Sequence, residues 1–173
     1  MLADYPVDFV GGGWSELAET TMAKSARFLG PLPFDAERAG LGSYLGAVSL
    51  NPNAEFSMHD RVFFSLGAGT VPIFDANQFS RWHLPLLSRF SFAQDPDSLR
   101  AAVETVLADP AAAQAATAAT FAEIYPRFSM RRSVEDICEI LTQLAGAGAE
   151  KLLPAEPFPA GVWTPQQLAK AVA

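Results

Sequence analysis

A cluster of polar residues just ahead of an apolar helical pattern carries the groups best suited to chemistry in this chain. Ser57 and Asp60 match the S-x-x-D pattern of a helix cap, and His59 and Arg61 share the same first turn. The free N–H groups and dipole of a helix amino terminus favour an anion, and the forked donors of a guanidinium suit a diphosphate. These residues predict a diphosphate site at a helix start. The alternative is that Arg61 pairs with Asp60 or Glu55 while His59 points into water.

A glycine turn is the second candidate for ligand binding. Gly11-Gly12-Gly13 follows an apolar run and Trp14 comes directly after. Glycines in such a turn let the backbone approach a ligand and aim its amide groups at a phosphate. The dinucleotide pattern G-x-G-x-x-G would need a glycine where Glu16 stands, which disfavours a nicotinamide cofactor. A tight strand-to-helix turn without a ligand is the alternative.

Nucleophilic catalysis is not indicated, and no catalytic residue is identified. His59 and His83 are the only histidines, and the chain has no G-x-S-x-G motif. We expect His83 to be a surface or half-buried residue. Trp14 and Trp82 could stack on a base or close a pocket, although core packing is the favoured interpretation. The single cysteine, Cys138, is expected to be a small buried side chain, with no partner for a disulfide and no zinc-binding spacing.

Short β-rich runs alternate with helical patterns along the chain. Strands are predicted at residues 7–10, 27–29, 46–50, 70–74 and 90–92, and helices at 14–25, 35–44, 59–67, 96–107, 110–124 and 131–144. Near-continuous apolar strands separated by helices are typical of parallel βαβ units. We therefore expect an α/β fold with a doubly wound, Rossmann-like, mostly parallel sheet of about five strands, helices on both faces and extra carboxyl-terminal helices.

The predicted sheet also predicts where a ligand would bind. In open parallel sheets, ligands lie beyond the carboxyl ends of the strands, near the point where the strand order reverses. This rule selects three loops, at residues 11–14, 51–60 and 75–79. Asn51, directly after the third predicted strand, belongs to the second of them.

Composition narrows the classes of function. The 173 residues, half of them hydrophobic and 18% charged, fit a folded domain over residues 1–150 and a proline-rich tail with a short terminal helix over residues 151–173. The net charge of −7 argues against nucleic acid as a partner. No apolar run approaches the roughly 20 residues of a membrane span, and the first residues lack the features of a signal peptide. We expect a cytoplasmic protein without a membrane span.

Taken in order, these motifs resemble the carboxyl-terminal domain of GT-B-fold glycosyltransferases, in particular the CgeB-like, glycosyltransferase family 1-like group. The likeness covers about residues 7 to 145. The segments that carry it are Val7 to Trp14, Phe28-Leu29-Gly30-Pro31-Leu32, Leu50-Asn51-Pro52, Ser57 to Phe63, Leu66 to Gly69, Val71 to Asp75, Leu107-Ala108-Asp109-Pro110 and Phe128-Ser129-Met130-Arg131-Arg132. Each motif alone is common, and their order is the specific feature.

The resemblance implies a domain that binds a nucleotide-diphosphate sugar as donor for glycosyl transfer, with no metal and no other cofactor. In this fold, electrostatic stabilisation of the leaving diphosphate replaces the metal. The resemblance implies that Arg61 and His59 face the phosphates and that the glycine turn lines the same side. It also implies that Asn51 and Ser57 frame the loop between them. The implied donor-binding residues are Gly12, Gly13, Trp14, Asn51, Ser57, His59, Asp60 and Arg61.

Two departures from the family pattern qualify this assignment. Phe64 stands where many relatives carry a glutamate near the ribose of the donor. In this fold the acceptor site and the base come from an amino-terminal domain, so hexosyl transfer is expected only with such a domain or a partner subunit. The alternative is a non-catalytic interaction module derived from a glycosyltransferase domain. A receiver-like domain is disfavoured, because glycines replace the acidic cluster that it needs after the first strand.

Overall fold

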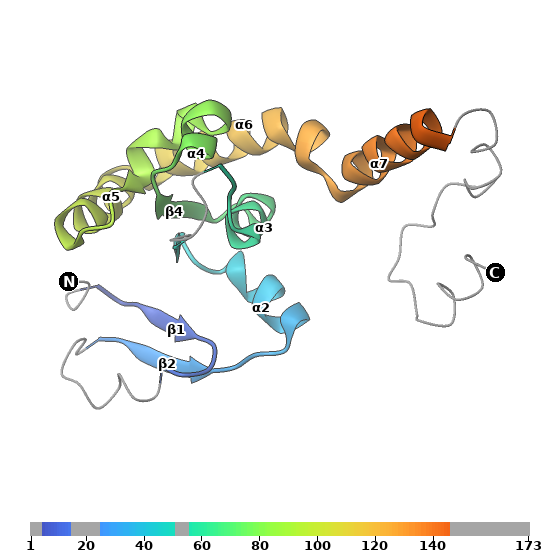
Figure 1. Ribbon diagram of the computed structural model, residues 1–173. Coiled ribbons are helices and arrows are strands. Elements are labelled where there is room, and N and C mark those ends of the chain that lie inside the picture. The colour runs from blue at the N-terminus through green and yellow to red at the C-terminus, as the bar shows by residue number, and fades with distance from the viewer. Residues whose placement is uncertain (1–4, 15–24, 51–55, 146–173) are drawn as a thin grey trace. The chain divides into compact units, whose positions relative to one another are not determined.

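The computed structural model describes residues 5–14, 25–50 and 56–145, and the predictions for Asn51, for most of the helix at 14–25 and for the tail lie outside these ranges. The chain divides into two compact units, residues 1–125 and residues 126–173. Helices and parallel strands make the first unit an α/β fold (Figure 1). No helix in the described ranges is long and apolar enough to cross a membrane.

A three-stranded parallel sheet forms the centre of the first unit. It consists of β3 (Gly46–Ser49), β4 (Val71–Asp75) and β5 (Ser91–Phe92), with β4 in the middle. Every residue of β4 is buried, and the helices α3 (Asp60–Ala68) and α5 (Pro96–Ala108) pack against it. Burial on both faces explains why β4 is a continuous apolar run up to its last residue.

The other two strands form a separate parallel sheet, which corrects the prediction of one sheet of about five strands. β1 (Asp8–Val10) pairs with β2 (Arg27–Gly30), and the register shifts between Phe9 and Val10. The Asp8 carboxylate accepts hydrogen bonds from Arg27 Nε at 2.7 Å and from the Tyr44 hydroxyl at 2.7 Å. Tyr44 comes two residues before β3. Within the described ranges, the Tyr44–Asp8 side-chain hydrogen bond therefore connects β1 to the residues just before β3. A single sheet would instead need main-chain hydrogen bonds between strands of the two groups.

Helices form close to the predicted positions within the described ranges, and two short ones, at residues 78–83 and 85–90, are added to them. The helices are α2 (Phe34–Leu41), α3, α4 (Gln78–His83), the 3₁₀ helix η1 (Pro85–Phe90), α5, α6 (Pro110–Phe128) and α7 (Met130–Ala145). Pro96 and Pro110 each occupy a first helical position, and Asp95 and Asp109 accept hydrogen bonds from main-chain N–H groups of the first turns of α5 and α6. α6 extends past its predicted end and contains Pro126.

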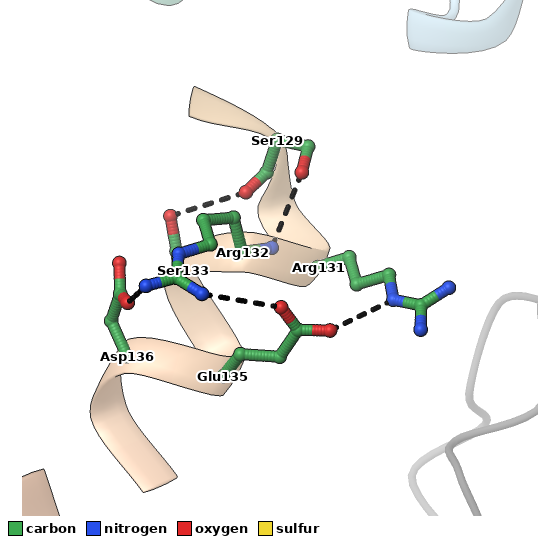
Figure 2. A network of polar contacts seen from close by, with 6 residues as sticks. All are labelled: Ser129, Arg131, Arg132, Ser133, Glu135 and Asp136. Carbon is green, nitrogen blue, oxygen red and sulfur yellow. Dashed lines mark hydrogen bonds and ion pairs between the residues drawn. The ribbon is translucent and has the colours of Figure 1, made fainter. Parts of the chain in front are cut away.

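Local polar contacts organise the start of α7 (Figure 2). The Ser129 hydroxyl accepts from the Arg132 N–H at 3.2 Å, Arg131 pairs with Glu135 at 2.9 Å, and Arg132 pairs with Asp136 at 2.6 Å. Both ion pairs have i, i+4 spacing, which contributes about 0.3–0.5 kcal/mol each at an exposed site. The two arginines of the resembling F-S-M-R-R segment therefore act here as helix-stabilising side chains.

Candidate functional site

The start of α3 differs from the predicted cap. His59, not Ser57, is the N-cap: it has an extended backbone, and its Nδ1 accepts a hydrogen bond from the Arg61 N–H at 3.2 Å. The Ser57 carbonyl lies two residues upstream and accepts from Asn77 Nδ2 at 2.9 Å. This contact holds Ser57 in the loop before the helix, so the S-x-x-D capping prediction is wrong. The predicted helix itself is confirmed.

The same His59 nitrogen also lies 2.5 Å from the Asp60 carboxylate. A single Nδ1 atom cannot accept from an N–H and donate to a carboxylate at once. An imidazole without a hydrogen on Nδ1 therefore caps α3, whereas one with a hydrogen on Nδ1 donates to Asp60 instead. Asp60 is engaged by His59 and not by Arg61, and its negative charge at the first helical residue opposes any anion bound there.

Arg61 is the second residue of α3 and is exposed to solvent. Its guanidinium forms no hydrogen bond or ion pair with any residue in the described ranges, and Glu55 lies outside them. The backbone beneath it is fixed: Val62 is fully buried, and the Ser65 hydroxyl donates to the Arg61 carbonyl at 2.8 Å. The donors of Arg61 are thus presented from a rigid helix start.

Asn77 joins two of the three predicted loops. It follows β4 by two residues and caps α4, where its Oδ1 accepts from the Ser80 N–H at 2.8 Å. Its Nδ2 donates to the Ser57 carbonyl, so the exit of β4 is connected to the loop that leads into α3. Asn77 and Ser80 are 7% and 4% exposed, respectively, so this junction is shielded from water. The N-x-x-S capping pattern after a strand was the signal that could have identified Asn77.

The glycine turn has its own local structure after β1. Gly11 and Gly13 have φ angles of 117° and 82°, a left-handed conformation that favours glycine. The Trp14 indole N–H donates back to the Val10 carbonyl at 3.2 Å, and its ring packs at 5.2 Å from the ring of Phe9. These contacts hold Trp14 against its own turn, on the two-stranded sheet. Among the described residues, a side chain at Gly12 would meet nothing within 4 Å.

The structure also shows the surroundings of four other residues that were considered from the sequence. The His83 ring lies 4.6 Å from the ring of Phe79, and Phe64 makes an edge contact with Phe34. Trp82 is 62% exposed, so the preference for core packing is wrong for this residue. Cys138 is half-buried. Phe56, which the sequence did not single out, lies beside Trp82 with ring centroids 6.3 Å apart.

Acidic, histidine and cysteine side chains do not gather into any group of three that could hold a metal ion within the described ranges. Comparison with protein-family models, curated proteins and solved structures finds no match to this chain. The likeness to a glycosyltransferase donor domain stays a prediction from the ordered motifs. The site geometry is the evidence on which a function can be argued.

Proposed function

We propose that this chain is the nucleotide-sugar-binding donor domain of a glycosyltransferase, with the diphosphate held at the start of α3. The observation that carries the proposal is the exposed guanidinium of Arg61 at the second residue of a helix that follows a parallel strand. The Asn77–Ser57 hydrogen bond supports it, since it fixes the loop in front of that helix to the exit of β4. A diphosphate in this position would meet main-chain N–H groups and the guanidinium of Arg61.

Local charges indicate that binding would be modest and sensitive to salt. The amino terminus of a helix carries roughly half a positive elementary charge, and Arg61 adds a full one. Asp60 opposes them from the adjacent position, and the whole chain has a net charge of −7. Affinity would then depend on directional hydrogen bonds at the site more than on long-range attraction, and salt would screen what attraction remains.

The finer fold and the complete reaction belong to the same proposal. All observed strand pairings are parallel, which supports a Rossmann-like arrangement of strands and helices. GT-B glycosyltransferases take the acceptor site and the base from a second domain. We therefore propose donor binding for this chain, and hexosyl transfer for its complex with such a domain or partner subunit.

Titration calorimetry at low ionic strength tests donor binding. UDP-, GDP- and dTDP-glucose would be titrated into wild-type protein and into Arg61→Ala, and we expect at least one to bind. Hydrogen bonds to a charged group contribute about 1.5–3 kcal/mol, so Arg61→Ala should weaken binding about tenfold or more. Asp60→Asn removes the opposing charge and should tighten binding about two- to fivefold.

Arg131→Ala is the matched control, because it removes the same charge from α7, where the side chain is 86% exposed. Its affinity should equal that of the wild type. Binding of none of the three sugar nucleotides, or equal effects of Arg61→Ala and Arg131→Ala, would reject the donor site. The chain would then fit the alternative of a non-catalytic interaction module.

A further inference from the structure

Two exposed aromatic side chains, Phe56 in the loop before α3 and Trp82 in α4, lie beside each other. Phe56 is 67% exposed and Trp82 is 62% exposed, and their rings are tilted by 37° with centroids 6.3 Å apart. They come from the two segments that Asn77 connects: Phe56 directly precedes Ser57, and Trp82 lies in α4, the helix that Asn77 caps. The ring pair and the hydrogen bond between the segments therefore belong to one junction.

Core packing does not account for this pair. On the same helix, Phe79 packs against the rings of Phe63 and His83, so the inward face of α4 is already occupied. Trp82 and Phe56 instead leave well over half of their surface to solvent while touching each other. Adjacent exposed aromatic rings form a continuous apolar patch, and such patches on a folded surface commonly mark a binding site.

We infer that Phe56 and Trp82 form a stacking platform for the nucleobase of the donor, an assignment that rests on the proposed function. A nucleoside diphosphate has a flat ring at one end and negative charge at the other. The junction offers matching chemistry, with aromatic rings before Ser57 and the guanidinium of Arg61 after it. Stacking on an indole face suits this occupant because every base presents a flat π surface, and the contact tolerates changes of base.

Titrations of pyrophosphate, UDP and GDP into the whole chain separate the two ends of the site. Trp82→Ala should weaken the nucleoside diphosphate that binds about tenfold and leave pyrophosphate unchanged, since only the former has a base to stack. Trp82→Phe should retain most of the affinity. Nucleotide binding should also quench tryptophan fluorescence in the wild type, and much less in Trp82→Phe. Tyr125→Ala, which removes another exposed aromatic ring, is the control and should change nothing.

The outcomes distinguish a wrong platform from a wrong function. If pyrophosphate fails to bind the wild type, or if Arg61→Ala binds it as well as the wild type does, the proposed function falls and the platform falls with it. If pyrophosphate binds but Trp82→Ala keeps full affinity for UDP and GDP, only the platform is overturned. Equal losses for pyrophosphate and nucleotide would show a structural role for Trp82. A loss confined to UDP-glucose, with UDP unchanged, would assign the rings to the sugar.

Discussion

Replacing Asn77 by serine would separate two contacts of this side chain within the described ranges. The Oδ1 atom of Asn77 caps α4, and Nδ2 reaches the Ser57 carbonyl at 2.9 Å. Serine is also a preferred N-cap residue and can still accept from the Ser80 N–H. It has no amide donor and is too short to reach Ser57. Asn77→Ser therefore removes the connection between the two loops while it preserves the cap and the net charge.

One partly buried hydrogen bond sets the size of the effect. Its loss should lower the free energy of unfolding by about 1 kcal/mol, a fall in Tm of roughly 3–4 °C for a chain of this size. In Asn77→Ser the loop before α3 is no longer held by this hydrogen bond. If the diphosphate binds at the start of α3, binding must then order that loop again. The same 1 kcal/mol then weakens pyrophosphate binding about fivefold.

Thermal unfolding and calorimetric titration with pyrophosphate would be measured for the wild type, Asn77→Ser and Ser80→Ala. The Ser80 hydroxyl accepts from the Asn77 N–H at 3.0 Å and donates to the Asn77 carbonyl at 2.8 Å. Ser80→Ala should therefore lose a similar amount of stability with the connection to Ser57 intact. We expect weaker pyrophosphate binding only in Asn77→Ser. An unchanged affinity in Asn77→Ser, or an equal loss in both variants, would refute the reasoning.

Two further predictions concern stability. The Thr120 hydroxyl is buried without a hydrogen-bond partner in the described ranges, so Thr120→Val should raise the free energy of urea unfolding by about 1 kcal/mol. Thr117→Val, which loses a hydroxyl bonded at 2.9 Å to a carbonyl one turn earlier, should not raise it. Hydrogen bonds from Arg27, and then from Tyr44, lower the pKa of Asp8. The stabilisation by Asp8 is thus full above the unfolded-state pKa of about 3.9 and is lost as pH falls through the folded-state pKa. Asp8→Asn should cost about 1 kcal/mol at pH 7, and urea unfolding near pH 2 should show a smaller difference from the wild type; a constant difference would contradict the assignment.

Sequence patterns located the helices well where the signals are local. Asp95 with Pro96, and Asp109 with Pro110, mark the starts of α5 and α6 at the predicted residues. Capping and apolar periodicity act within a few positions along the chain, so they can be read without the rest of the fold. The end of α6 was missed, because the helix continues through Pro126.

The candidate site was found only in part by sequence. The turn of His59 to Arg61 does begin a helix after a parallel strand, as predicted. Asn77 and Phe56 were not found, because their partners are 20 and 26 residues away along the chain. The assignment of the glycine turn to the same phosphate site stays a prediction, because the described contacts of Trp14 are local, with Val10 and Phe9.

By itself the sequence indicated most of the strands and helices, including the apolar run that becomes β4. Only the tertiary structure decided which strands pair, which residue caps α3 and which aromatic rings stay exposed. The physical reason is the range of the interactions. Side-chain caps and apolar periodicity depend on neighbours in the chain, whereas the contacts of Tyr44 with Asp8 and of Asn77 with Ser57 form only when distant segments meet.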